Sequence, residues 1–573
     1  MPVQNTDIAE IFNRVADLLD IEEGNPFRIR AYRNAARTVS SLAQSVSDMV
    51  KAEKDLTVIP GFGKDLAARL KEIVETGGLS LLKELEGRTP LDLVKLTRFA
   101  GLGPKRVKTL YHQLGITTLQ ELKDAAEKGK IQEIRGFGEK TEQAILEGLK
   151  SAQTTEKRFK LPEAEQRAKA LVEYLKQIPG IKQVTVAGSF RRRKETVGDL
   201  DVLVTCRKGS KVIDRFVAFE DVTKVISKGG TRSTVLLRPN LQVDLRVLPE
   251  ASYGAALQYF TGSKAHNIGI RKLGVERKLK INEYGVFRGE KRIAGRTEEE
   301  VYRQVDLPYI EPELRESQGE IKAAQEGRLP QLVRVEDIRG DLHVHTSETD
   351  GRATLEEMVK AAQDRGYEYV AVTDHSRRVA MVHGFDAKRL AEQIKEIDRL
   401  NGRLKHIVIL KSVELDILED GSPDLPDDIL KDLDLTVFSI HYNRRLSRTK
   451  QTERVLRAMD NPHLNIFAHP TGQLIDEREP YEIDLERIML GARERGCLME
   501  LNAHPDRFDL SDKYCKMAKE LGIKVAISTD AHGVPDFDFM RFGVDQARRG
   551  WLEPGDVANT GTWPELKTLL KRR

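Results

Sequence analysis

The distribution of apolar and polar residues changes character along the chain. Over residues 6–149, apolar side chains recur every three or four positions, which predicts helices joined by short glycine turns. From 184 to 247 the apolar runs are short and β-branched, which predicts strands. The strands expected there are 183–187 and 202–205, followed by a hairpin of 234–237 and 243–247 around Pro239-Asn240.

The last part of the chain shows a different alternation. After Asp341, helical stretches alternate with short apolar segments at 369–372, 406–410 and 435–438. This βα pattern is typical of a parallel sheet or barrel. We expect a linker before it, because residues 317–337 are polar and contain Gly319, Gly327 and Pro330.

The length of 573 residues suits several domains, because single domains usually hold about 100–200 residues. The changes of pattern predict a multidomain fold with a helical front, a part with strands and a βα sheet or barrel. The linker is expected at 317–337 and the last domain at 338–573.

Composition excludes several classes of protein. Charged residues make up 32% and hydrophobic residues 39% of the chain, as in globular rather than disordered proteins. No apolar run approaches the ~20 residues that span a bilayer, and the first residues lack the pattern of a secretion signal. Three cysteines without a CxxC pair provide neither a disulfide framework nor a thiolate metal site. We therefore expect a cytoplasmic protein that does not bind membranes.

Charge is distributed unevenly, although the formal net charge is only +4. Residues 1–320 carry 55 Lys and Arg against 45 Asp and Glu, whereas 321–573 carry 39 against 45. A basic front half predicts binding to a polyanion, and an acidic, histidine-rich back half predicts metal ligands. Chance asymmetry is the alternative.

One glycine pattern occurs three times in the helical front, at 59–64, 100–105 and 135–140. A Gly-apolar-Gly turn before a helix lets backbone N–H groups face a phosphate, and a nearby Lys adds positive charge. The pattern resembles the helix-hairpin-helix motif, which binds the DNA backbone without reading sequence. A plain helix connector is the alternative for any single turn. The candidate DNA-binding residues are Gly61, Gly63, Lys64, Gly101, Gly103, Lys105, Gly136 and Gly138.

Three carboxylates lie on the predicted strands where they can converge. Asp199 and Asp201 are two residues apart, so both leave the same face of a strand. Asp244 lies within the strand 243–247, where a plain core would need an apolar residue. Three convergent carboxylates can hold two Mg²⁺ ions for nucleotidyl transfer. Upstream of them, phosphate can be bound by Gly188, Ser189 and Arg192.

This combination resembles the family X DNA polymerases, to which DNA polymerase beta belongs. Residues 259–263 with Asn267 are similar to that family's nucleotide pocket, and 281–285 and 307–315 are similar to its closing subdomain. The resemblance covers 1–316. It implies an N-terminal helical domain with the first helix-hairpin-helix at 1–82 and a helical, fingers-like DNA-binding domain at 83–152. It also implies an α+β nucleotidyltransferase palm at 153–250 and a small thumb-like α/β subdomain at 251–316.

The resemblance also implies residue roles. The catalytic, metal-binding trio would be Asp199, Asp201 and Asp244, with Asp244 nearest the primer hydroxyl. Tyr259 and Phe260 would line the sugar, Gly262 would keep the ribose side narrow and Asn267 would touch the minor-groove edge of the new base pair. The full nucleotide-binding set is Gly188, Ser189, Arg192, Gly198, Tyr259, Phe260, Gly262 and Asn267.

Two positions depart from the family pattern. In members with deoxyribose-phosphate lyase activity, a Schiff-base lysine stands on the helix after the first glycine turn, where this chain has Arg69. A guanidinium cannot form that imine near neutral pH, so we expect lyase activity to be absent or weak unless Lys64 or Lys71 substitutes. Gln242 stands where the family often has an arginine beside the third carboxylate, a change expected to affect primer handling rather than metal binding.

Ten of the 12 histidines follow residue 340, and six of these ten lie at strand positions or strand ends that could form a site. His343 and His345 lie on one face of the strand that opens the barrel, and the others come at or just past the ends of later strands. Strand ends of a barrel converge on one rim, and imidazole with carboxylate suits Mn²⁺, Zn²⁺ or Fe²⁺. A structural role is the alternative for any single histidine.

These motifs resemble the PHP (polymerase and histidinol phosphatase) domain, a distorted seven-stranded βα barrel that holds three metal ions. All nine implied ligand positions are filled, which implies hydrolysis of a phosphodiester rather than an inactive scaffold. His504 is either a substrate-phosphate contact or a bystander. The implied metal ligands are His343, His345, Asp350, His375, Glu414, His441, His469, Asp530 and His532.

The two halves together predict a bacterial-type family X repair polymerase. The front would fill short gaps by adding dNTPs with Mg²⁺, and the barrel would remove nucleotides 3′→5′ with Mn²⁺ or Zn²⁺; by resemblance it could also incise abasic sites. We expect a monomer acting on gapped or primer–template DNA. The alternatives are a small-molecule phosphoesterase of the histidinol-phosphatase type tethered to a non-polymerising DNA-binding front half, and a non-catalytic repair scaffold.

Overall fold

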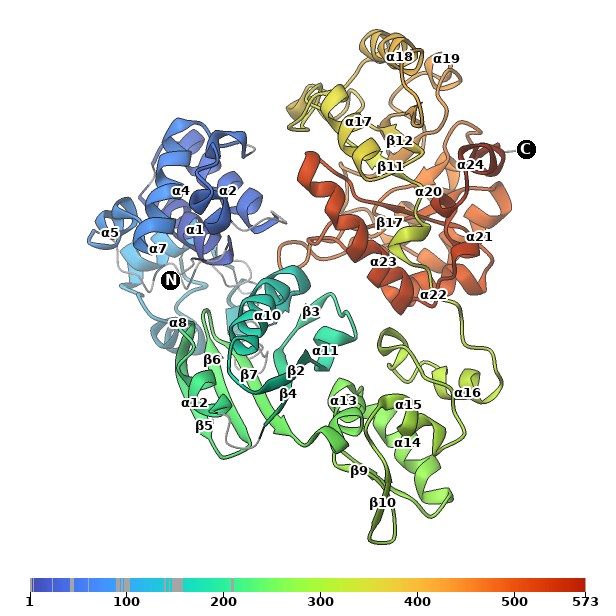
Figure 1. Cartoon of the computed structure of the whole chain (residues 1–573). Helices are drawn as coiled ribbons and strands as arrows, with labels where there is room; N and C mark the ends of the chain where they lie inside the picture. The colour runs from blue at the N-terminus through green and yellow to red at the C-terminus, as the bar shows by residue number, and fades with distance from the viewer. Residues whose placement is uncertain are drawn as a thin grey trace. The chain divides into compact units, whose positions relative to one another are not determined.

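The computed structural model describes residues 3–571 except 4, 23, 42–45, 60, 89–92, 94–95, 97–101, 103, 135, 139–140, 144, 147–157 and 208–210; the side chains of 6, 37, 40, 41, 48, 104, 105 and 119 also lie outside the description. The chain forms two compact units, Met1–Arg158 and Phe159–Arg573, which run from blue to cyan and from teal to red in Figure 1. Within the described part, no helix combines the length and the apolar character that crossing a bilayer requires.

The first unit is helical, as the apolar spacing predicts. Ile8, Phe12, Val15 and Leu19 are buried along one side of α1, so a periodic stripe forms the contact face. The described elements of this unit are α1 (Asn5–Ile21), α2 (Pro26–Ser41), α3 (Val46–Lys51), η1 (Leu56–Val58), α4 (Lys64–Thr76), α5 (Ser80–Glu86), α7 (Pro104–Leu114) and α8 (Leu119–Glu127).

The second unit begins with a five-stranded sheet in the order β2-β4-β7-β6-β5. The four predicted strands are confirmed with slightly different ends, and β6 and β7 form the predicted antiparallel hairpin. β4 and β7 run parallel. The elements are β1 (Phe159–Lys160), α10 (Leu161–Lys176), β2 (Ile181–Val186), α11 (Gly188–Arg191), β3 (Thr196–Val197), β4 (Asp199–Cys206), α12 (Val212–Val217), β5 (Val222–Lys228), β6 (Arg232–Leu237) and β7 (Leu241–Leu248).

Alternation along β4 separates the two faces of this sheet. Leu200, Val202 and Val204 join the apolar core that includes α10 and α12. Residues at odd positions leave the opposite face, where Leu203 packs with Ala256 of α13. Asp199 and Asp201 therefore project on the side away from α10 and α12.

A smaller subdomain follows, with a three-stranded sheet in the order β10-β9-β8. Its elements are η2 (Glu250–Ser252), α13 (Tyr253–Thr261), α14 (Lys264–Glu276), β8 (Lys280–Asn282), β9 (Gly285–Arg288), β10 (Lys291–Ala294), α15 (Glu298–Arg303), η3 (Pro312–Leu314) and α16 (Glu320–Gln325). The other predicted boundaries, at 82, 152, 250 and 316, stay predictions.

The interpretation of residues 317–337 as a plain polar linker is wrong, because α16 and η4 (Val335–Asp337) lie inside it. Ala324 and Leu332 are buried in the core of the preceding subdomain. Glu320 is also buried, and its Oε1 lies 2.7 Å from Nδ1 of the buried His266. Polar composition hid this helix, because the buried His266 that partners Glu320 lies 54 residues away in the sequence, while the other donors to this carboxylate are the nearby backbone N–H groups of Ser317 and Gln318.

Residues 338–571 form a parallel barrel with seven strand positions. β13 and β14 share one position, since β13 pairs with β12 and β14 with β15. The barrel closes where Val344 bridges Ala531, next to a hydrogen bond of 2.8 Å from His345 N to Ala531 O. The strands are β11 (Gly340–Val344), β12 (Tyr369–Val372), β13 (Val408–Lys411), β14 (Glu414–Asp416), β15 (Val437–Ser439), β16 (Ile466–Phe467), β17 (Leu498–Asn502) and β18 (Val525–Ser528).

Helices surround these strands, as Figure 1 shows in yellow to red. The strands and helices of the barrel share one large apolar core, because the buried faces of the helices pack on strand residues such as Val370, Ile409 and Val525. The helices are α17 (Leu355–Asp364), η5 (Ala380–Val382), α18 (Ala387–Asn401), α19 (Asp427–Leu430), α20 (Arg448–Ala458), α21 (Leu485–Arg495), α22 (Asp512–Glu520), η6 (Val534–Phe539), α23 (Met540–Arg549), η7 (Pro554–Asp556), η8 (Ala558–Thr560) and α24 (Trp563–Leu570).

Candidate active sites

The three predicted palm carboxylates come together on β4 and β7. Asp201 and Asp244 are register partners of the parallel pair, and Asp199 is paired with Gln242. Register partners in a sheet point to the same side, so the three carboxylates share one face. Asp199 is exposed, Asp201 half-buried and Asp244 buried.

The local electrostatics of this face favour a bound cation. Burial, with the charges of Asp199 and Asp244, raises the pKa of Asp201 to about 7. Gly188 brings the start of α11 against the same carboxylate: its φ is +65°, and a Cβ there would lie 2.9 Å from Asp201 Oδ2. Glycine is therefore needed for this close approach.

Asp244 is held by neutral and charged donors. Thr234 Oγ1 donates to Asp244 Oδ1 over 2.7 Å, and Gln242 Nε2 donates to Oδ2 over 2.8 Å. Arg232 Nη2 lies 3.3 Å from Oδ1. Gln242 thus occupies the predicted place beside the third carboxylate and presents a neutral amide to it, while Arg232 of the hairpin partner β6 supplies a guanidinium.

Arg192, the predicted phosphate ligand, lies at the end of α11. Its Nε is 2.9 Å from Glu316 Oε1, and its Nη1 donates to the carbonyl of Thr261. Gly262 follows with φ +70°, and a Cβ there would stand 3.2 Å from Arg192 Nη1. The glycine lets this guanidinium lie against the backbone of the predicted nucleotide pocket.

The other predicted nucleotide residues surround the same segment. Phe260 stacks beneath Arg246 with 4.3 Å from guanidinium carbon to ring centroid, and its ring is 5.1 Å from that of Tyr259. Asn267 is buried; its Nδ2 donates to Tyr259 O over 2.7 Å, and its Oδ1 accepts from Gln258 over 2.9 Å. Ser189 and Gly198 are half-buried at the ends of α11 and β3.

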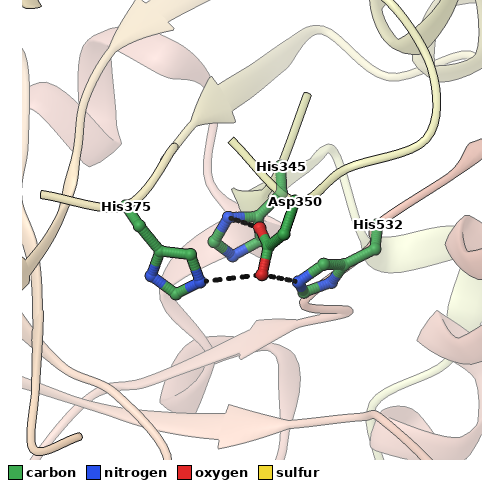
Figure 2. A group of neighbouring side chains, drawn as sticks. All are labelled: His345, Asp350, His375 and His532. Carbon is green, nitrogen blue, oxygen red and sulfur yellow. Dashed lines mark ion pairs between the residues drawn. The ribbon is translucent and has the colours of Figure 1, made fainter. Parts of the chain in front are cut away.

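All nine predicted ligands of the barrel lie together. Oxygen and nitrogen atoms within 4.8 Å of one another form three groups: His345, Asp350, His375 and His532; His343, His345 and Asp530; and His375, Glu414 and His441. His469 joins them through Nε2, 2.9 Å from Glu414 Oε1. Figure 2 shows the first group, in which three imidazoles from separate loops face the Asp350 carboxylate.

The donor chemistry of these groups fits divalent metal ions. Burial, with the charges of His532 and His375, lowers the pKa of His345 to about 4 and so favours its neutral, metal-binding form. Among the described residues the buried Nδ1 of His345 has no hydrogen-bond partner. Nε2 of His345 lies 3.1 Å from Nε2 of His343. Nitrogen atoms so arranged can share a cation.

Three residues that the sequence did not single out support this cluster. Glu500 Oε1 lies 2.7 Å from His343 Nδ1, and Glu500 Oε2 accepts from His469 N over 2.7 Å. Such a carboxylate fixes the tautomer and the orientation of a ligating imidazole. Asn502 Nδ2 donates to Asp530 Oδ2 over 3.0 Å, and Arg507 Nε lies 3.3 Å from the same oxygen. These three residues can be identified only from their contacts in the folded structure.

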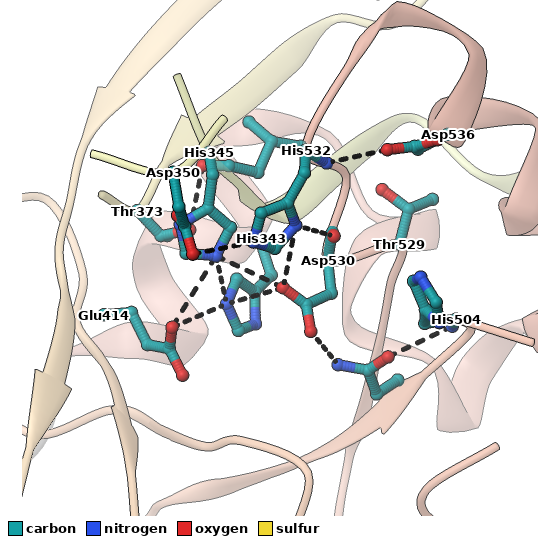
Figure 3. A network of polar contacts seen from close by, with 12 residues as sticks. His343, His345, Asp350, Thr373, Glu414, His504, Thr529, Asp530, His532 and Asp536 are labelled. Atoms are coloured by element: carbon teal, nitrogen blue, oxygen red, sulfur yellow. Dashed lines mark hydrogen bonds and ion pairs between the residues drawn. The ribbon is translucent and has the colours of Figure 1, made fainter. Parts of the chain in front are cut away.

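His504 is a structural neighbour of the site. Its Nδ1 accepts from Asp506 N over 3.2 Å, and its ring packs edge-on against Phe539 with centroids 5.1 Å apart. Figure 3 shows His504 to one side of the cluster formed by His343, His345 and Asp530. These contacts favour the bystander interpretation over the substrate contact.

Two of the three predicted glycine turns are described. Gly61 has φ +76° and Gly136 has φ +96°, and in each turn the following Phe donates its N–H to the carbonyl three residues before it. Gly63 caps α4, which begins at Lys64. Gly138 O accepts from Thr141 N and Glu142 N. The second turn, with Gly101, Gly103 and the side chain of Lys105, lies outside the described residues.

The position expected for a lyase lysine carries a paired arginine. Arg69 Nε donates to Asp65 Oδ2 over 3.1 Å, and the guanidinium lies 5.9 Å above the ring centroid of Tyr32. Lys71 lies 3.7 Å from Glu75 on the exposed side of α4. Arg69 therefore stays a cation held by its own helix.

Known protein families match four separate regions of the chain. Family models match a helix-hairpin-helix domain at 3–79, a SAM-like helix-hairpin-helix tandem at 93–151, the DNA polymerase beta thumb at 256–316 and the PHP domain at 341–483. The chain is 30% identical over 250 residues to a probable phosphatase of Thermoanaerobacter sp. (strain X514), covering 41% of this chain and 94% of that one.

Two polymerases are also similar. DNA polymerase lambda of Rattus norvegicus is 28% identical over 341 residues, covering 54% of this chain and 56% of that one. DNA polymerase/3′-5′ exonuclease PolX of Bacillus subtilis (strain 168) is 37% identical over 571 residues, covering 99% of both chains. With this match over its whole length, the chain belongs to the family X DNA polymerases that carry a C-terminal PHP domain.

Proposed function

We propose that this protein is a DNA polymerase that fills short gaps in DNA repair and a 3′-5′ exonuclease, with the two activities in separate centres. The observation that carries the polymerase activity is the register pairing of Asp201 with Asp244, with Asp199 on the same face. The relative from Bacillus subtilis bears both activities in its name. We further infer that the protein acts in the cytoplasm, because its three cysteines are free thiols, as expected in a reducing compartment. We also infer that it acts as a monomer.

Asp199, Asp201 and Asp244 offer the hard oxygen ligands that Mg²⁺ prefers. Two Mg²⁺ ions bound there would supply Lewis-acid activation of the attacking oxygen and neutralise charge on the leaving phosphate. Asp244 is the residue that takes the proton of the primer 3′ hydroxyl, on a carboxylate oriented by Thr234 and Gln242. This orientation fixes where the primer end must lie.

The triphosphate would lie between the start of α11 and the segment around Gly262. Arg192 binds its β- or γ-phosphate, since a guanidinium matches phosphate geometry. Ser189 and the backbone of Gly188 approach the same phosphates. Tyr259 and Phe260 line the sugar, and Asn267 reaches the minor-groove edge after leaving its contacts with Tyr259 O and Gln258.

The barrel would perform the hydrolytic reaction. Its nine ligands can hold up to three Mn²⁺ or Zn²⁺ ions, which would supply Lewis-acid activation for attack of water on a phosphodiester. Glu500 keeps the His343 imidazole in one orientation. The same chemistry could cleave the backbone at abasic sites. Hydrolysis of small phosphomonoesters is the second candidate, because the barrel half resembles a probable phosphatase.

A gapped duplex with a labelled primer tests these proposals. With Mg²⁺ and dNTPs we expect extension of the primer into the gap, and with Mn²⁺ and no dNTPs we expect shortening from its 3′ end. Phosphate release from sugar and amino-alcohol phosphates should be much slower than primer shortening. Release that is faster than shortening, or no extension with either metal, would contradict the proposal.

A further inference from the structure

Helix α23 of the barrel contacts the palm through its C-terminal arginine. Arg549 is only 5% exposed. Its Nη1 donates to the backbone carbonyl of Arg192 over 2.8 Å and lies 3.1 Å from Glu316 Oε1. Its Nη2 pairs with Asp512 of α22. One side chain of the barrel therefore holds both the backbone and the acidic partner of the proposed phosphate ligand.

A single carboxylate oxygen is shared by two guanidinium groups. Glu316 Oε1 accepts from Arg192 Nε over 2.9 Å as well as from Arg549. The Arg192 and Glu316 side chains are 12% and 14% exposed. Although burial opposes the charged form, Arg192 and Arg549 keep the pKa of Glu316 below its ordinary value. Glu316 is therefore a buried anion that depends on these cations.

An incoming triphosphate would compete with Glu316 for Arg192. A buried carboxylate that loses its partner is costly, so Glu316 alone would retain Arg192. Arg549 changes this balance because it stays paired with Glu316 after Arg192 has turned to the phosphate.

We propose that Arg549, a residue of the PHP barrel, is a positioning residue for the polymerase reaction that compensates Glu316 and so releases Arg192 to bind the dNTP phosphates. The proposal rests on the polymerase function proposed above. It assigns the barrel a role in nucleotide binding that is separate from its own hydrolytic centre.

The first test is the variant Arg549→Met in the full-length protein. We expect the KM for dNTP in single-nucleotide gap filling to rise about tenfold while kcat changes less than about twofold, because the loss concerns binding before chemistry. Exonuclease activity should stay unchanged. The matched control is Arg548→Met, which removes a neighbouring contact of the same helix, to Glu313 at 2.8 Å, without touching Arg192 or Glu316. This control should leave the KM unchanged.

The second test is rescue. In the double variant Arg549→Met/Glu316→Gln the unpaired carboxylate is gone, so the KM should return to within about twofold of the wild-type value. A purely structural role for Arg549 predicts no rescue, and that result would overturn the proposal. An unchanged KM in Arg549→Met, or an equal rise in Arg548→Met, would also overturn it.

Glu316→Gln alone provides a measurement that does not depend on the folding of Arg549→Met. It should keep or lower the KM for dNTP, and a rise of about tenfold would overturn the proposal. A wild-type protein that adds no nucleotide at all would instead refute the proposed polymerase function. The two failures are therefore distinguishable.

Discussion

Asp201 and Asp244 face one another as register partners on two parallel strands, β4 and β7. The pairing places two buried or half-buried carboxylates side by side, with the exposed Asp199 nearby. Repulsion between these carboxylates is unfavourable when no cation is bound, and bound cations would offset it.

In metal-free protein, Asp201→Asn should stabilise the palm at pH 8. The folded pKa of Asp201 is about 7, above the value of about 4 in an unfolded chain, so its contribution to stability is present below pH 4 and lost as the pH rises through 7. Thermal unfolding in chelator should show a Tm higher by about 2–4 °C for each kcal/mol of penalty removed. The difference should disappear near pH 4.

The matched control for this prediction is Asp214→Asn. Asp214 is an exposed palm carboxylate whose pKa is lowered by Lys228, so its removal should not raise the Tm. Mg²⁺ should stabilise the wild type more than Asp201→Asn. A variant no more stable than the wild type at pH 8 would show that Asp201 carries no such penalty.

Glu500→Gln should weaken metal binding in the barrel. Glu500 orients His343 through Nδ1, and loss of such an outer carboxylate typically costs about 10- to 100-fold in metal affinity. We expect the Mn²⁺ concentration that gives half-maximal exonuclease activity to rise by that factor, with polymerase activity retained. Glu494→Gln, an exposed glutamate of α21, is the control and should change neither activity. Equal Mn²⁺ dependence in both variants would contradict this role.

Gly63→Ala should weaken DNA binding without disturbing the fold. Gly63 has an ordinary φ of −75°, and no atom lies within 4 Å of the position that an alanine Cβ would take, so the free protein can accept alanine. A phosphate at the start of α4 would meet that methyl group. We expect the affinity for duplex DNA, measured by fluorescence anisotropy, to fall about fivefold, which corresponds to the loss of one hydrogen bond. The decrease should be the same for DNA duplexes of unrelated sequence.

Gly78→Ala is the control for Gly63→Ala, because it also has open space around it and no left-handed φ. It should bind DNA as the wild type does. Equal affinities of the two variants would show that phosphate does not approach the first glycine turn. The turn would then be a helix connector.

The wild-type protein should form no covalent adduct with a 5′-deoxyribose phosphate when imines are trapped with borohydride. Arg69 is a guanidinium paired with Asp65 and cannot form a Schiff base near neutral pH. Arg69→Lys should gain a trapped adduct, whereas Arg69→Ala should not. An adduct in the wild type would point to Lys64 or Lys71 as the nucleophile.

The convergence of the histidines and carboxylates of the barrel could be predicted from the sequence, because a polar residue at a strand end can be recognised without knowledge of distant contacts. His343, Glu414 and Asp530 each interrupt or follow an apolar strand, and parallel strand ends share a rim. The palm carboxylates were visible for a related reason: Asp244 stands within an otherwise apolar strand. Family resemblance added the roles of these residues.

Residues that act through a distant partner could not be found in this way. Glu500 gains its role from the strand pairing that brings β17 toward His343, and nothing in its local sequence distinguishes it from a solvated glutamate. From its sequence alone, helix α16 resembles a polar linker. Only the structure shows that Glu320 contacts the buried His266. Arg549 is one of two adjacent arginines at a helix end, and only the fold shows which of them reaches Arg192.

We propose that one chain holds two independent active centres. The most direct test compares Asp199→Ala and His343→Ala on the same labelled gapped duplex, with and without dNTPs. Asp199→Ala should lose primer extension and keep 3′→5′ shortening, and His343→Ala should keep extension and lose shortening. Loss of both activities in each variant, with the fold intact, would contradict the account.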